Sequence, residues 1–356
     1  MTAACADLQL VVLLRLIDAT ALIARDPRVD LAPGQGGCPS FVAPLVLGAD
    51  HLPDFALLDP ASPYTHLSLP VIARRPSALL AGLLALAAFL LLSGASARAA
   101  KPAPYLALGD SVTFGYQEAT VQPPPDYMNA ASFQAFPEFV GDALHLRTTN
   151  AACPGETTAS FINPSAPSNG CENYFPISES GYRTVYPLHV KYEGSQLSFA
   201  VHFLKTHPRT RLVSLMIGAN DLFLCQRTTS DGCVSELPAT LAKVTRNVRR
   251  ILAAIRGKAG YDGRIVLVHY YSLDYSSSFI TDTVRALNAA DDAAAKGLRI
   301  LRADGFGQYQ RASAHSGGDT CKAGLLTQLS GGGCGVHPSY AGHGLLALAV
   351  ERALPR

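Results

Sequence analysis

Residues 105–116 read YLALGDSVTFGY, an apolar run that passes directly into a glycine, an aspartate and Ser111. The same arrangement recurs in residues 211–221, RLVSLMIGAND, where a longer apolar run is followed by Asn220. Short apolar runs bounded by glycine are typical of buried strands. In parallel sheets, functional side chains gather at the carboxyl ends of such strands. The two segments therefore predict buried neighbouring strands that end in polar, chemically useful residues.

Apolar runs alternate with segments of helical spacing through the rest of the chain. In residues 238–256, for example, Leu241, Val244 and Val248 follow one another at steps of three and four residues, as in an amphipathic helix. The predicted strands are 105–108, 145–152, 211–217, 264–271 and 298–301, and the predicted helices are 132–144, 195–205, 238–256, 281–296 and 338–352. Residues 154–192 predict a long loop. This alternation favours an α/β fold, with a parallel sheet covered by helices on both faces.

The composition excludes several classes of protein. Lys plus Arg is 29 and Asp plus Glu is 27, and only 16% of the 356 residues are charged, so a nucleic-acid partner is not expected. Nucleotide-binding glycine loops and a zinc-binding H-E-x-x-H are missing, as is the G-x-S-x-G of ordinary α/β-hydrolases. We expect no metal or cofactor.

Residues 71–100 carry the features of a secretion signal. Arg74 and Arg75 precede an uninterrupted apolar run, residues 78–92, and the sequence Ala97-Arg98-Ala99 follows as a cleavage site. The run is shorter than the roughly 20 residues that span a bilayer. Residues 1–70 show no clear period, and we interpret them as a doubtful extension, with translation beginning near Val71. We therefore expect a protein that is secreted or held at the cell envelope, with no stable membrane span after cleavage.

Six cysteines follow the predicted cleavage site, and an even number in an exported domain predicts disulfides. They are Cys153, Cys171, Cys225, Cys233, Cys321 and Cys334. Six cysteines allow 15 connectivities. The simplest pairs nearest neighbours, 153–171, 225–233 and 321–334. A zinc site is the alternative, but no C-x-x-C pair supports it.

Four short clusters carry candidate chemistry. Ser111 follows the first strand, and Gly155 lies in the loop after the second strand, where its N–H can approach a ligand closely. Asn220 follows the third strand and can donate a hydrogen bond to an oxyanion. His337 precedes Pro338 at the start of the last helix, which predicts an extended, accessible loop. Each cluster alone has an ordinary structural reading as a turn or a helix cap.

Together and in this order, the four clusters resemble the motifs of the GDSL or SGNH hydrolase family over residues 103–350. The resemblance implies a flavodoxin-like three-layer α/β/α domain over residues 101–356. It also implies Ser111 as nucleophile and His337 as general base. The oxyanion hole would consist of the N–H groups of Ser111 and Gly155 and the side-chain amide of Asn220. The remaining histidines, among them His269, His315 and His343, are interpreted as surface or structural residues.

One position departs from the family pattern. The usual acid lies three residues before the histidine, and here that position is Cys334. Some exported family members with three disulfides resemble this chain and use a Ser–His dyad, in which a main-chain carbonyl orients the imidazole. We therefore expect a carbonyl of Cys334 or Gly335 to accept from Nδ1 of His337. Asp304 and Asp319 are nearby carboxylates that could substitute.

The sequence thus predicts a secreted, monomeric serine esterase or lipase that acts on small-molecule or lipid esters through an acyl-enzyme. Apolar residues around the motifs favour acyl esters: Val112, Phe114, Tyr116, Leu222 and Phe223. Two alternatives remain open. One is an esterase that removes acetyl groups from carbohydrates, although the chain has no Trp for sugar stacking. The other is a non-catalytic binding module of the cell envelope.

Overall fold

Five parallel strands form the central sheet of the computed structural model, which describes residues 101–355. The predicted extension (1–70) and signal peptide (71–100) lie outside the described residues. The strands are β1 (Pro104–Gly109), β2 (Arg147–Asn150), β3 (Leu212–Met216), β4 (Arg264–Val268) and β5 (Leu301–Ala303). Their order, β2-β1-β3-β4-β5, is that of flavodoxin-like folds. The predicted fold class is confirmed.

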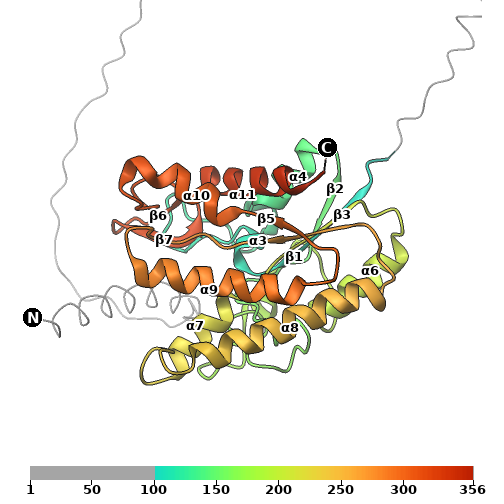
Figure 1. Cartoon of the computed structure of the whole chain (residues 1–356), viewed down its shortest axis with the longest axis horizontal. Helices are drawn as coiled ribbons and strands as arrows, with labels where there is room; N and C mark the ends of the chain where they lie inside the picture. The colour runs from blue at the N-terminus through green and yellow to red at the C-terminus, as the bar shows by residue number, and fades with distance from the viewer. Residues whose placement is uncertain (1–100, 356) are drawn as a thin grey trace, which may run out of the picture. The chain divides into compact units, whose positions relative to one another are not determined.

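Helices cover both faces of the sheet (Figure 1). One layer contains α4 (Phe136–Ala143), α10 (Gly305–Ser313) and α11 (Tyr340–Ala353). The other contains α6 (Gln196–Thr206), α7 (Ala219–Thr228), α8 (Leu237–Gly257) and α9 (Ser278–Ala295). Short helices, α3 (Ser111–Phe114), α5 (Tyr182–Val185), η2 (Ala130–Ser132) and η3 (Ala314–Ser316), lie in the connections.

The apolar periodicity explains how the outer layers attach to the sheet. In α8, Val244, Val248 and Leu252 are fully buried, as the spacing of the sequence predicts. All five residues of β3 are buried as well, because this strand has a neighbour on each side and a helix layer on each face. The core therefore lies between the sheet and both helix layers, and the carboxyl ends of the strands are left to form a site.

The main differences from the sequence prediction are two helices and a hairpin. Helices α7 and α10 were not predicted, because α7 begins within the polar Gly-Ala-Asn-Asp motif and α10 has few apolar residues. An antiparallel hairpin of β6 (Leu326–Gln328) and β7 (Cys334–Pro338) was also missed. His337 consequently lies on a strand and is only 5% exposed, so its backbone is extended as expected but the predicted accessible loop is wrong.

The three predicted disulfides are confirmed. Cys153 pairs with Cys171, Cys225 with Cys233, and Cys321 with Cys334, and their Cα atoms lie 5.6, 5.3 and 5.7 Å apart. Each closes a short loop next to the carboxyl edge of the sheet or the hairpin beside it. Among residues 101–355, no helix has both the length and the apolar character needed to cross a membrane.

Candidate active site

Ser111 lies at the first position of α3, directly after β1. Gly109 makes this sharp exit from the strand possible, because its φ of +149° is one that other residues rarely adopt. A Cβ at Gly109 would also lie only 2.2 Å from the carbonyl oxygen of Met216 on β3. The first N–H groups of a helix have no intrahelical acceptor, so the N–H of Ser111 can serve a ligand.

Asp110 caps α3 and joins two other elements to it. Its Oδ1 accepts from the N–H of Val112 at 3.0 Å, and its Oδ2 accepts from the hydroxyl of Tyr270 at 2.5 Å and from Nδ2 of Asn220 at 3.2 Å. Burial raises the pKa of Asp110 to about 6, although the hydrogen bond from Tyr270 acts in the opposite direction. The sequence indicated only a helix cap here and gave no sign of the wider network.

The side-chain amide of Asn220 is held from both ends. Its Nδ2 donates to Asp110, while its Oδ1 accepts from Nδ2 of Asn169 at 2.7 Å. Asn169 in turn accepts from the guanidinium of Arg227. An ionised carboxylate has no hydrogen to donate, so the atom of Asn220 that faces Asp110 must be the amide nitrogen. The amide oxygen of Asn220 then faces Asn169. One N–H of Asn220 remains for a ligand in the cavity that this side chain lines.

Gly155 lies in the loop after β2, where its φ is +80°. Its carbonyl accepts from the N–H of Asn169 at 2.8 Å, and a Cβ at this position would lie 2.6 Å from the Asn169 carbonyl oxygen. The Cys153–Cys171 disulfide closes this loop. Gly155 is therefore next to the residue that orients Asn220, although it is not among the residues that line the cavity.

His337 enters the site from β7, and its imidazole is paired with a carboxylate. Its Nδ1 lies 2.7 Å from Oε1 of Glu118, which also accepts from the N–H groups of Val336 at 2.9 Å and His337 at 3.4 Å. The other oxygen of Glu118 accepts from the hydroxyl of Thr327 at 2.5 Å. The ring of Tyr116 packs edge-on against the imidazole, with centroids 4.9 Å apart.

The expected partner of His337 is thus corrected. We expected a carbonyl of Cys334 or Gly335, and the structure instead places the Glu118 carboxylate at Nδ1. The two aspartates considered as substitutes have other contacts. Asp304 caps α10 through the N–H of Gly307, and Asp319 pairs with Lys322 at 3.1 Å. Cys334 is in a disulfide as expected, so it provides no acid.

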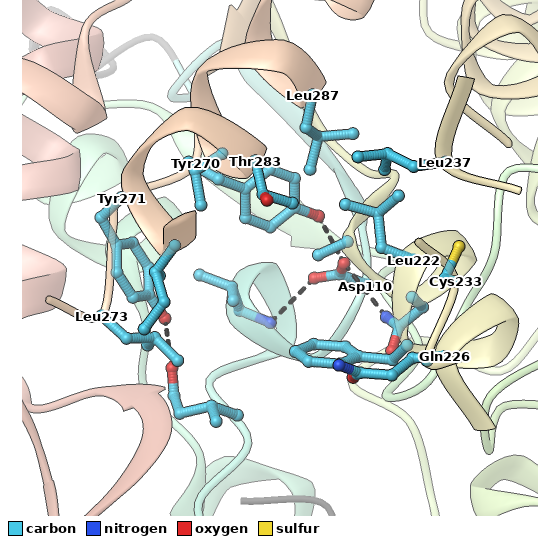
Figure 2. Close-up of a pocket in the computed structure, with 18 of the residues that line it drawn as sticks. Asp110, Leu222, Gln226, Cys233, Leu237, Tyr270, Tyr271, Leu273, Thr283 and Leu287 are labelled. Carbon is cyan, nitrogen blue, oxygen red and sulfur yellow. Dashed lines mark hydrogen bonds between the residues drawn. The ribbon is translucent and has the colours of Figure 1, made fainter. Parts of the chain in front are cut away.

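Ser111, Asn220 and His337 all line one cavity of about 230 Å³. Figure 2 shows other residues of its wall, among them Leu222, Tyr271 and Leu287. Most of its wall is apolar and comes from α7, the loop before α8 and the first half of α9. The apolar residues of the wall include Val112 from α3, Leu273 from the loop before α9, and Leu222, Phe223, Val234, Leu237, Phe279, Ile280, Val284 and Leu287. Of the apolar residues singled out in the sequence, Val112, Leu222 and Phe223 line the cavity. Phe114 and Tyr116 instead belong to a separate buried aromatic cluster with Phe133 and Tyr182.

Comparison with known proteins identifies the family of the chain. Residues 107–345 match the model of the GDSL-like Lipase/Acylhydrolase family. The chain belongs to this family. Ester hydrolysis is the activity of such acylhydrolases, and this GDSL hydrolase is accordingly an ester hydrolase. No curated protein matches the chain significantly.

Solved structures with similar folds are only distantly related to this GDSL hydrolase. A phospholipase A1 from Streptomyces albidoflavus NA297 is 16% identical, with a TM-score of 0.45, over 71% of this chain and 100% of the other. An acetylxylan esterase from Geobacillus stearothermophilus is 16% identical, with a TM-score of 0.43, over 71% of this chain and 95% of the other. A GDSL-like lipase from Parabacteroides merdae is 15% identical, with a TM-score of 0.44, over 71% and 95%.

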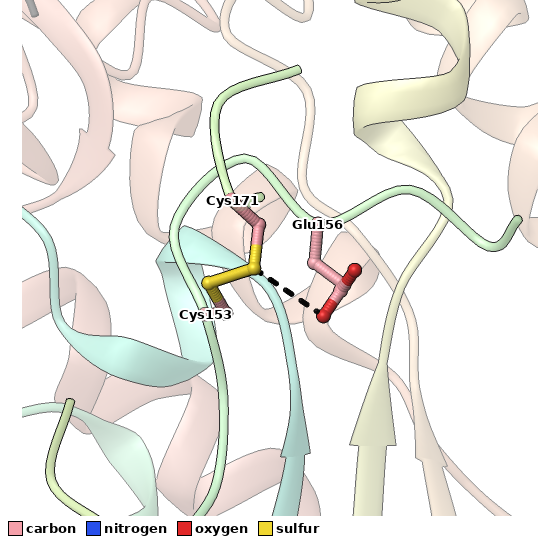
Figure 3. A group of neighbouring side chains, drawn as sticks. All are labelled: Cys153, Glu156 and Cys171. Carbon is pink, nitrogen blue, oxygen red and sulfur yellow. Dashed lines mark hydrogen bonds between the residues drawn. A yellow bond between two sulfur atoms is a disulfide. The ribbon is translucent and has the colours of Figure 1, made fainter. Parts of the chain in front are cut away.

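A cluster of potential metal ligands in the GDSL hydrolase has another explanation. Cys153, Glu156 and Cys171 lie together, but their two sulfurs are joined in a disulfide, so neither is a thiolate that could bind a metal (Figure 3). Burial raises the pKa of the Glu156 carboxyl well above its usual range. One of its oxygens lies 3.6 Å from the Cys171 sulfur. A disulfide sulfur carries no hydrogen to donate, and this oxygen accepts instead from Nε2 of Gln196 at 3.1 Å.

His269, His315 and His343 show the structural or surface placement expected from the sequence. His343 lies on α11 and is 1% exposed, and burial lowers its pKa to about 3. His315 is exposed in η3, and His269 pairs with Asp292 at 3.1 Å. None of the three lines the cavity.

Proposed function

We propose that this protein hydrolyses carboxylic esters through an acyl-enzyme on Ser111, with His337 as the general base. The observation that carries the proposal is the convergence of Ser111 and His337, 226 positions apart in the chain, on one apolar cavity. A serine hydroxyl is a weak nucleophile until a neighbouring base removes its proton. The second requirement, donors for the oxyanion, is supplied in this proposal by Ser111, Gly155 and Asn220.

The proposed steps follow from these positions. Nε2 of His337 takes the proton of the Ser111 hydroxyl as its oxygen attacks the ester carbonyl, and returns that proton to the departing alcohol. The acyl group remains on Ser111 until a water, activated by the same imidazole, releases the acid. The Asn220 amide is already fixed by Asp110 and Asn169, so little reorganisation is needed when the oxyanion forms.

The cavity supports an ester with an apolar acyl chain as the substrate. Leu222, Leu237 and Leu287 lie on one side, and Leu273 lies on the other (Figure 2). Each methylene of an acyl chain that leaves water for such a wall gains about 0.8 kcal/mol. A carbohydrate would instead require a largely polar wall with hydrogen-bond partners for its hydroxyl groups, and most of this wall is apolar. The carbohydrate acetyl esterase is therefore the second candidate, and a panel of substrates decides between the two.

A serine-reactive fluorophosphonate and a set of p-nitrophenyl esters test the proposal. We expect the probe to label purified residues 101–356 and the Ser111→Ala variant to remain unlabelled. Rates should rise from acetate towards medium chain lengths. Hydrolysis of acetylated xylan with no gain from longer p-nitrophenyl chains would favour the carbohydrate esterase. A folded wild-type protein that the probe does not label would instead indicate a binding module and contradict the proposal.

Export is also part of the proposal, and the three disulfides support it because such bonds persist in oxidising compartments. N-terminal sequencing of protein recovered from the culture medium and from envelope fractions provides the test. We expect a first residue between Arg98 and Lys101. Recovery of protein that begins within residues 1–70 would contradict the predicted signal peptide.

A further inference from the structure

Glu118 is positioned in the site by backbone contacts that the sequence does not predict. Gly115 caps the C-terminus of α3, and its φ of +89° turns the chain away from the helix. Val121 then forms an antiparallel bridge with Leu329 in the β6–β7 hairpin, and the carbonyl of Thr120 accepts from the N–H of Ser330. These contacts hold the segment between α3 and Val121 beside the hairpin that carries His337.

The carboxylate of Glu118 is fully engaged in this position. Oε1 accepts from Nδ1 of His337 and from two backbone N–H groups of β7, and Oε2 accepts from Thr327. The Glu118 side chain is 3% exposed and that of His337 is 6% exposed. A buried carboxylate is costly unless it is paired and hydrogen-bonded, so this arrangement stabilises the ionised form.

The ionised form of Glu118 determines which nitrogen of His337 carries hydrogen. Burial by itself would raise the pKa of Glu118, but the charge of His337 and hydrogen bonds from His337 and Thr327 outweigh it and lower the pKa to about 2. The carboxylate can only accept, so Nδ1 of His337 holds a proton and Nε2 is left to act as a base. That is the nitrogen the proposed mechanism requires.

We infer that Glu118 is the positioning residue for His337, so that the site is a Ser111–His337–Glu118 triad with its acid moved from position 334. The inference rests on the proposed function. In the reaction, Nε2 receives the proton from Ser111 while Nδ1 keeps its own. The Glu118 carboxylate stabilises the resulting imidazolium without accepting a proton. The proton on Nε2 then leaves with the alcohol, and the imidazole returns to its starting state.

The Glu118→Gln variant tests this role because it keeps the shape of the side chain and removes only its charge. Its amide oxygen can still accept from β7, so the hairpin should stay in place. We expect kcat to fall by about 10³–10⁴-fold, as for loss of a triad carboxylate, with little change in KM. The acid limb of the pH–rate profile should move to lower pH, because protonated His337 loses its anionic partner.

Five other titratable groups near Glu118 and His337 could also affect the pH–rate profile. They are Tyr116, Tyr127, Tyr271, Asp110 and His343. Burial raises the pKa values of the three tyrosines, that of Tyr127 to about 12, so they stay neutral over the working range. Asp110 and His343 are unchanged in the variant, so the difference between the two profiles reports on Glu118.

Glu138→Gln is the matched control. Glu138 is a half-buried glutamate outside the cavity that accepts from Asn150 and from the N–H of Ala135. Its variant removes a half-buried carboxylate without touching His337, and we expect kcat and the acid limb to stay as in wild type. Glu118→Asp keeps the charge on a shorter side chain and should recover part of the lost rate.

Failure of the role proposed for Glu118 and failure of the proposed function give different results. A Glu118→Gln enzyme that folds and keeps kcat within a few-fold overturns the inference. A fall in kcat with an unmoved acid limb also overturns it, since that result indicates a structural role alone. If the Gln variant does not fold, proton NMR of the Ser111→Ala protein decides. A ring N–H bonded to a buried carboxylate resonates far downfield, and lack of such a signal from His337 contradicts the pairing whether or not the wild type is active.

Discussion

The backbone of Gly335 lies directly against the carboxylate of Glu118. A Cβ at residue 335 would come within 2.0 Å of Oε1, the atom that accepts from His337. The φ of Gly335 lies outside the left-handed region, so the reason for glycine here is space rather than backbone conformation. A hairpin strand and a loop more than two hundred residues earlier can therefore meet only because position 335 has no side chain.

Gly335→Ala should weaken catalysis without a direct change to any polar group. The added methyl group displaces the Glu118 carboxylate, and a displacement of about 1 Å at a catalytic group can cost about 10²-fold in rate. We expect a fall in kcat of that order with an unchanged melting profile of the disulfide-bonded core, measured by ester hydrolysis and circular dichroism. Gly331→Ala is the control, because that exposed turn position has nothing within 4 Å of its Cβ. Equal rates for the two variants would contradict the expected displacement.

The sequence predicted that residues at the carboxyl ends of the strands would line the candidate site. Ser111 and Asn220 directly follow apolar runs, and parallel strands bring their carboxyl ends to one edge. Helix α8 was predicted equally well, since its apolar residues from Leu241 to Ile255 recur at every third or fourth position. These features depend on local periodicity, which is visible in a single chain.

Glu118 could not be found in this way. It follows α3 by four residues in a segment without periodicity, and its position depends on a bridge between Val121 and Leu329. The family pattern places the acid three residues before the histidine, and Glu118 lies more than two hundred residues from that position. A useful signal would have been that Glu118 is the first carboxylate after Ser111 in the sequence, because a carboxylate that becomes buried near a nucleophile needs a partner. Helix α7 was missed because its first turn is the polar motif itself.

The Cys225–Cys233 disulfide should support the acyl site as well as stability. Gly232, Cys233 and Val234 line the cavity, and the disulfide ties their loop to α7. Replacing both cysteines with alanine should lower the free energy of unfolding by about 2–3 kcal/mol in the chain-entropy model, measured by urea denaturation. KM should rise more for long-chain esters than for acetate. An equal change for both esters would contradict a role in the acyl site, and free thiols in the wild type by mass spectrometry would contradict the disulfide itself.

Asp291 should make the protein less stable as the pH rises. It is fully buried on α9, and neither carboxyl oxygen has a hydrogen-bond partner among residues 101–355. Burial, with the nearby charges of Asp292, Asp221 and Asp110, raises its pKa well above the usual range. The folded state thus holds a proton that the unfolded chain releases above a pKa of about 3.9. Stability from this group is complete below that pH and is lost as the pH rises towards the folded pKa, by up to about 1.4 kcal/mol per unit.

Asp291→Asn removes this titration while keeping a neutral side chain of similar shape. In urea unfolding between pH 5 and pH 8, we expect the variant to lose less stability than wild type and to be the more stable of the two at pH 8. Asp282→Asn is the control on the same helix, since that carboxylate is exposed and pairs with Arg285 at 3.0 Å. Parallel pH profiles for wild type and Asp291→Asn would show that the buried carboxyl is already ionised.

Thr283→Trp should shorten the acyl chain that the enzyme accepts. Thr283 is half-buried and lines the cavity on α9, so an indole there would occupy space that we assign to the distal part of the chain. Each methylene kept in water forfeits about 0.8 kcal/mol, or roughly a fourfold loss in kcat/KM for each excluded carbon. Acetate should be hydrolysed as by wild type, because Ser111 and His337 are untouched. Asp282→Trp, at the adjacent exposed position outside the cavity, should leave the chain-length profile unchanged. If Thr283→Trp lowers the rates of short and long esters equally, the acyl chain does not extend along α9. The apolar wall on that helix would then not be the acyl-binding surface.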